Sequence, residues 1–67
     1  MSIGDRIKQA RKQRGLSRKE LAALVGVTTS SISNYEVGIS FPKPSVLCAL
    51  FGALKVDANF LFQDYLP

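Results

Sequence analysis

The residues best suited to chemistry form a run of short polar side chains between positions 28 and 34. Thr28, Thr29, Ser30, Ser33 and Asn34 supply hydroxyl groups and one carboxamide, and the run carries no charge. A carboxamide can donate and accept hydrogen bonds together, hydroxyls bond adaptably, and threonine methyls offer small apolar contacts. These side chains therefore suit binding to a ligand. The alternative is an ordinary solvated helix face, which composition alone favours.

A first short helix is predicted immediately before this run. Ser17 is a suitable N-cap, and Glu20 three residues later completes a capping box. Gly26 is expected to end the helix, because glycine enters the left-handed region without a Cβ penalty. Between these ends runs an apolar stripe at helical spacing, made of Leu21, Ala22, Leu24 and Val25.

A second short helix is predicted to follow at a sharp angle, from a cap at Thr28 to about Tyr35. Val27 is expected to be a buried pivot between the two helices, and Ile32 and Tyr35 are the large apolar residues of the second. Two short helices around a tight turn, the second with an uncharged polar face, indicate a helix-turn-helix over residues 17–37.

The rest of the chain is predicted to form three further helices, without any strand pattern. Apolar spacing predicts one helix over residues 3–14, one from Pro44 to about Lys55, and a short one capped by Asp57. Cys48 flanks the apolar stripe of the fourth helix and is expected to pack as a small hydrophobe. The sequence therefore predicts an all-α fold in a single small domain.

The basic residues of this chain are concentrated near its start. The net charge is +4 over 67 residues, but residues 1–20 carry +5 and residues 21–67 carry −1. A basic end on a small domain favours a polyanionic partner. A solvated helix face would explain the same charges, and the charge pattern by itself leaves both interpretations open.

The residue inventory argues against an enzyme, a metal site or a cofactor site. There is no histidine, one cysteine and five scattered acidic residues, and no glycine-rich phosphate-binding motif is present. The apolar runs are too short to cross a bilayer, and the first residues lead directly into a charged helix rather than a signal peptide. With its lone Cys48, the chain is expected to be cytoplasmic.

The order and spacing of one set of residues resemble those of the phage-repressor and Cro-type (XRE) helix-turn-helix family. The resemblance covers essentially the whole chain. It implies a compact five-helix, lambda-repressor-like DNA-binding domain, acting as a transcriptional regulator and most commonly as a repressor. The matching residues are Leu21-Ala22, Gly26-Val27, Ser31-Ile32, Tyr35-Glu36, Gly38, Pro42, Leu47, Leu50, Leu54, Val56 and Leu61.

The same resemblance implies partners. Double-stranded DNA is expected as the ligand, bound by a homodimer on two half-sites about 34 Å apart. Many relatives continue into a sensing or dimerisation domain, so the chain is expected to be the N-terminal part of a longer regulator.

By resemblance, the helix that Thr28 caps, which is the third along the chain, reads the bases through the five polar residues of the 28–34 run. Relatives often carry glutamines where this chain has Thr29, Ser30 and Asn34, so no operator sequence follows from the match. The family also pairs an arginine and a glutamate at the positions of Arg11 and Glu36, which predicts an ion pair between the first and third helices.

Phosphate contacts are expected from basic residues beside helix starts. Arg18 and Lys19 open the helix that Ser17 caps, where free amides and the helix dipole also favour an anion. Lys43 and the amides of the loop over residues 38–41 are expected to hold the backbone on the other side of the groove.

The tail leaves a second interpretation open. Phe62, Tyr65 and Leu66 add apolar area that either folds back onto the first helix or forms a surface for another molecule. If that surface holds a protein partner, the chain is instead an antitoxin-like or adaptor module of the same fold.

Overall fold

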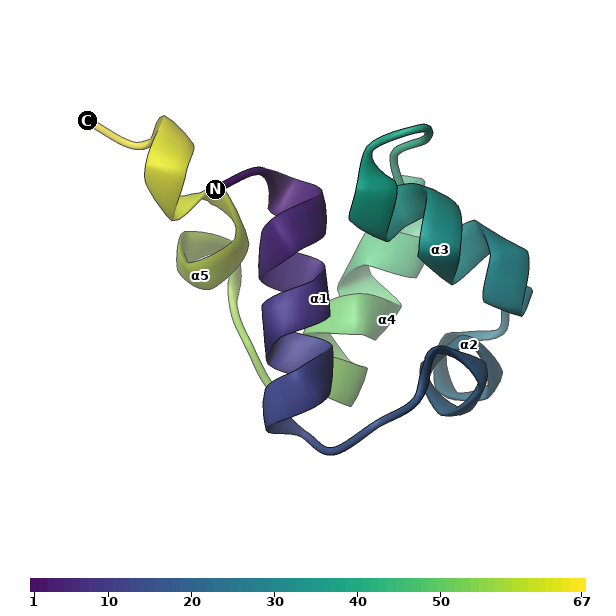
Figure 1. Ribbon diagram of the computed structural model, residues 1–67. Helices are drawn as coiled ribbons and strands as arrows, with labels where there is room; N and C mark the ends of the chain where they lie inside the picture. The colour runs from purple at the N-terminus through teal and green to yellow at the C-terminus, as the bar shows by residue number, and fades with distance from the viewer.

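The computed structural model describes all residues, 1–67, and confirms the predicted all-α fold. Five α-helices are followed by a single 3-10 turn, and the structure contains no strand (Figure 1). The elements are α1 (Ile3–Gln13), α2 (Arg18–Val25), α3 (Thr29–Val37), α4 (Pro44–Leu54), α5 (Ala58–Phe62) and η1 (Gln63–Tyr65). No single helix is long and apolar enough to cross a membrane; α4 and the α5–η1 segment pass that test only as a pair bent by 108°.

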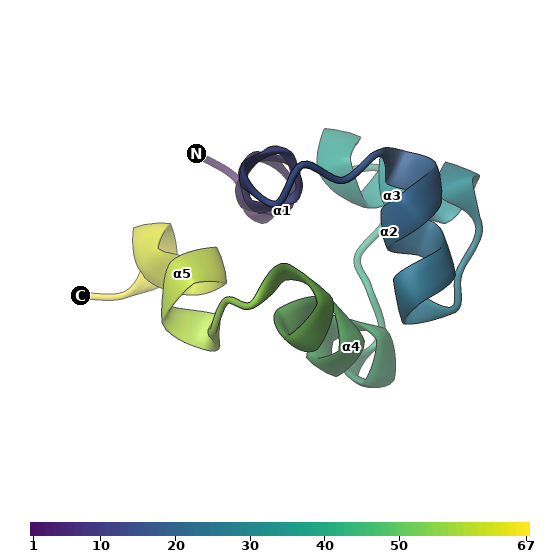
Figure 2. The ribbon, with the colours of Figure 1, turned by 90° about the horizontal axis from the view of Figure 1, so that it is seen from below.

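The first helix lies between the helix-turn-helix and the end of the chain. In Figure 1 and in the view along its axis in Figure 2, α2 and α3 lie on one side of α1, while α5 and η1 lie on the other. α3 packs against both α1 and α2, and α4 packs against α2. The side chains buried between the helices are Ile7, Ala10, Leu21, Ala22, Ile32, Leu50, Leu54 and Leu61.

The predicted helix caps are present. The Ser17 hydroxyl accepts from the Glu20 amide at 3.0 Å, and the Glu20 carboxylate accepts from the Ser17 amide at 2.8 Å. The hydrogen bond from the Ser17 amide is the main cause that lowers the pKa of Glu20, and the interaction with the Ser17 hydroxyl is the second. Gly26 ends α2 in the left-handed region with φ of 75°, which allows the sharp turn into α3. Capping hydrogen bonds also come from Ser2, Thr28 and Asp57.

Two helical side chains lie off the buried side, and one residue of the turn is less buried than expected. Leu24 is 61% exposed, because it lies about 100° around the helix from Val25 and off the buried side. Cys48 is exposed for the same reason, one step around α4 from Leu47 and away from the core. Val27 is half-buried rather than fully buried, although it packs against the core.

Two helix ends differ from their predicted positions. α1 stops at Gln13, with Arg14 as its C-cap, one residue before the predicted end. α3 continues to Val37, two residues past the predicted end, because the left-handed residue that terminates it is Gly38.

Ion pairs of Asp64 hold the C-terminal tail against α1, while the last apolar side chains of the tail remain exposed. Asp64 accepts from the Arg6 guanidinium at 3.1 Å, and the terminal ammonium of Met1 lies 3.3 Å from the same carboxylate. Tyr65 and Leu66 are exposed. The tail therefore folds back toward α1 through Asp64, as one interpretation predicted. The side chains of Tyr65 and Leu66 nevertheless stay exposed.

This contact predicts a pH dependence of stability. The hydrogen bond from Arg6 holds the pKa of Asp64 below its usual value of 3.8. A carboxyl group whose pKa is lower in the folded state than in the unfolded state stabilises the folded state at pH values above the unfolded pKa. This contribution disappears as the pH falls through the folded pKa. In thermal unfolding from neutral pH to about pH 2, Asp64→Asn is expected to be less stable than the parent at neutral pH and to approach it in acid. A constant difference at every pH would contradict the assignment.

Candidate nucleic-acid interface

The outward side of α3 carries an uncharged polar surface, here called the reading face: Thr29, Ser30, Ser33 and Asn34. Thr29 and Ser30 are exposed, and Ser33 and Asn34 are half-buried. None of the four side chains makes a hydrogen bond within the protein, although each carries a polar group. The reading face is thus free to bond to an external partner. Four of the five predicted base-reading residues lie together on it.

Thr28, the fifth predicted reader, is engaged within the protein. Its hydroxyl accepts from the Ser31 amide at 3.0 Å and lies 2.9 Å from the Ser31 hydroxyl. The side chain is exposed, so its methyl group remains available to a ligand. Because α3 depends on this cap, Thr28 positions the reading face as well as bordering it.

A buried charge network fixes the inner side of the same helix. The predicted pair is present: the Arg11 Nε lies 2.7 Å from the Glu36 carboxylate, and the two side chains are only 8% and 1% exposed. Arg11 also donates to the Leu16 carbonyl at 2.9 Å. Arg18 donates from Nε to the other Glu36 oxygen at 3.1 Å. One carboxylate therefore joins α1, α2 and α3.

The predicted phosphate-binding residues fall into two groups. Lys19 in the first turn of α2 and Lys43 at the N-cap of α4 are exposed and make no ion pair. Arg18 is 39% exposed and already bound to Glu36 through Nε, which sequence reasoning missed. Its two terminal nitrogens make no hydrogen bond in the protein, so Arg18 can hold Glu36 and an external anion together.

Two residues that shape this region escaped sequence reasoning, one at the end of α3 and one behind it. Val37 ends α3 on the same side as Ser30, Ser33 and Asn34, with spacings of seven, four and three residues, and helical spacing was the signal available for it. Gly4 is buried at the crossing of α1 and α3. A glycine within an otherwise regular helix was the only hint of that close approach.

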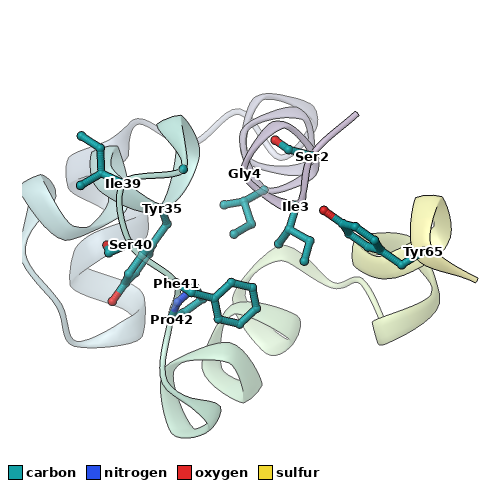
Figure 3. Close-up of a pocket in the computed structure, with 11 residues that line it drawn as sticks. Ser2, Ile3, Gly4, Tyr35, Ile39, Ser40, Phe41, Pro42 and Tyr65 are labelled. Atoms are coloured by element: carbon teal, nitrogen blue, oxygen red, sulfur yellow. The ribbon is translucent and has the colours of Figure 1, made fainter.

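A shallow hollow of about 330 Å³ opens beside α1, away from the reading face residues. Figure 3 shows Ile3, Phe41 and Tyr65 turned toward it, from α1, from the loop after α3 and from η1. No charged side chain lines it. Among the residues expected to hold a protein partner, Phe62 packs half-buried against the core, while Tyr65 and Leu66 remain exposed.

Two short helices at a tight glycine turn, with the second one open on its outer side, define a helix-turn-helix domain. The helix-turn-helix family HTH_3 matches residues 7–61, and the chain belongs to this family. It is 33% identical over 64 residues to an HTH-type transcriptional regulator, y4wC, of Sinorhizobium fredii, covering 96% of this chain and 45% of that protein. The chain spans about half the length of the curated relatives it matches.

Solved structures agree with this assignment. The P22 c2 repressor, crystallised with a synthetic operator, superposes with a TM-score of 0.87 at 31% identity, over 91% of this chain and 92% of that one. The biofilm regulator SinR in complex with DNA gives a TM-score of 0.82 at 38% identity, over 90% and 97% of the two chains. The five-helix, repressor-like fold expected from the sequence is confirmed by these likenesses.

Proposed function

We propose that this chain binds double-stranded DNA sequence-specifically, as a transcriptional repressor, with α3 in the major groove.

The observation that carries this proposal is the reading face. Its polar groups have no partner within the protein, while Glu36 anchors the same helix from its buried side. A rigid helix with free donors and acceptors is what base readout in the major groove requires. Support comes from the likeness to a repressor bound to its operator and to SinR bound to DNA.

Each residue of the reading face has a distinct role in the proposal. Asn34 bonds to the N6 and N7 edge of an adenine, the one bidentate base contact that this face offers. Thr29, Ser30 and Ser33 offer hydroxyls that accept several bases. Thr28 contributes its methyl group, because its hydroxyl caps α3.

Lys19 and Lys43 supply the phosphate contacts, with Arg18 bridging Glu36 and the DNA backbone. Each phosphate that a side chain neutralises adds about 0.9 to the slope of log affinity against log salt. Lys19→Gln and Lys43→Gln are each expected to reduce the slope by about 0.9 per binding subunit, and nearly equally on all duplexes. Lys55→Gln is the matched control, since Lys55 is exposed at the opposite end of α4. Equal slopes for all three variants and the parent would remove the two lysines from the phosphate contacts.

The active unit is proposed to be a homodimer on two half-sites about one turn, or 34 Å, apart, because one short helix reads only a few base pairs. We further propose that the chain is the N-terminal part of a longer cytoplasmic regulator, a binding module rather than an enzyme, and that it needs no cofactor. About half the length of its relatives lies outside the matched region, which supports a longer protein.

Selection of bound sequences from a random duplex pool tests the proposal. We expect a palindrome whose half-sites lie one helical turn apart and contain adenine at a fixed position. Recovery of an unenriched pool, under conditions where the chain is folded, would contradict sequence-specific binding.

The adaptor alternative has less support. Tyr65 and Leu66 are exposed near an uncharged hollow, but Phe62 is half-buried and serves the core. The relatives named as transcriptional regulators and the repressor–DNA structures favour DNA binding over this alternative.

A further inference from the structure

Val37 places an unpartnered apolar group at the end of the reading face. The side chain is 66% exposed and does not pack against the core. It follows Ser30, Ser33 and Asn34 at seven, four and three residues, so the four side chains share one side of α3. The buried Ile32 lies on the opposite side. An apolar residue therefore continues a surface that is otherwise made of hydrogen-bonding groups.

The loop after α3 leaves this side chain uncovered. Gly38 turns the chain in the left-handed region directly after Val37. The amides of Ile39 and Ser40 then fold back to donate to the Asn34 carbonyl, at 2.9 and 3.4 Å. The isopropyl group is thus the last group of α3 that a ligand lying along the reading face would meet.

We propose that Val37 is a specificity-determining residue that packs against the C5-methyl group of a thymine. This inference rests on the proposed binding of α3 in the major groove, where the thymine methyl is the apolar group that base pairs display. A cytosine at the same place would turn its amino group toward Val37. The valine cannot accept a hydrogen bond from that group, which would lose its contact with water at a cost in free energy. The contact therefore selects thymine over cytosine at one position.

The position follows from helix geometry. Val37 lies about 10 Å along α3 from Ser30, at a rise of about 1.5 Å per residue. With bases stacked about 3.4 Å apart, the thymine lies up to about three base-pair steps from the base beneath Ser30. The N-terminus of α3 contacts one end of the half-site, and this thymine lies at the other end.

The test replaces single thymines by deoxyuridine in one half-site of the selected duplex, which removes only the methyl group. For the parent chain, one replacement is expected to weaken binding about fourfold, the effect of one buried methyl. Val37→Ala should show a similar loss on the thymine duplex and little further loss on the deoxyuridine duplex. Ile39→Ala is the matched control, an exposed apolar residue beyond the helix end, and should keep the full sensitivity to deoxyuridine.

Two results would overturn the inference. In one, Val37→Ala remains as sensitive to the methyl group as the parent; in the other, no thymine in the half-site is sensitive in the parent. Either result leaves the proposed function standing, because the palindrome is still selected. Failure to select any sequence removes the function itself, so the two failures are distinguishable.

Discussion

Replacing Glu36 with alanine is expected to lower the free energy of unfolding by about 3–5 kcal/mol, because it strands a buried charge. Arg11 is 8% exposed and bonds to this carboxylate at 2.7 Å, and Arg18 bonds to the second oxygen at 3.1 Å. A domain of this size has a total stability of only about 3–10 kcal/mol. Chemical denaturation should therefore show the loss of a large part of the parent's stability.

The partner variants separate the stranded charge from a general effect of truncation. Arg11→Ala should be comparably damaging, since it leaves Glu36 with the more exposed arginine and removes the bond to the Leu16 carbonyl. Arg18→Ala is the milder control, and is expected to cost under about 1 kcal/mol, because its side chain is 39% exposed. Equal small losses for all three variants would show that the network contributes little to stability.

Replacing Gly4 with alanine is also expected to lower the free energy of unfolding strongly. An added Cβ would lie 2.5 Å from the Glu36 carbonyl oxygen and closer still to that of Tyr35, both backbone atoms of α3. Backbone atoms inside a helix cannot move aside as a flexible side chain does, so α1 and α3 must separate. We expect a loss of about 2–3 kcal/mol in the free energy of unfolding, despite the higher helix propensity of alanine.

Gly52→Ala provides the matched control for this prediction. Gly52 lies within α4, is exposed, and would have nothing within 4 Å of an added Cβ. The same substitution should therefore stabilise the domain there by about 0.5–1 kcal/mol. Opposite signs at the two positions, measured by urea denaturation, support the close approach; stabilisation at both positions would contradict it.

Caps and periodic apolar spacing were sufficient to predict the architecture. Ser17, Gly26 and Thr28 act through hydrogen bonds and backbone preferences within a few residues, so their roles can be seen in the sequence alone. The all-α fold and the boundaries of α2 followed from them. The Arg11–Glu36 pair was predicted by resemblance, because nothing local relates residues 25 positions apart.

Features that depend on tertiary packing were missed. Arg18 is bound to Glu36 because α2 and α3 cross there, which the spacing of the two residues does not reveal. Gly4 is required by the distance between two helix backbones. Cys48 was expected to pack as a small hydrophobe, and Leu24 was placed on the apolar stripe of its helix, but both side chains are exposed. In the candidate site, composition identified the reading face but not Val37, whose role depends on where α3 ends.

The specificity of an Asn34→Ala variant shows whether the reading face contacts base edges. Affinities of the parent and the variant are compared on the selected duplex and on a random duplex at the same salt concentration. Loss of the Asn34–adenine contact should reduce the difference in binding free energy between the two duplexes by about 1–3 kcal/mol, with little change on the random duplex. An equal loss on both duplexes would show that Asn34 does not read a base, and would contradict the account.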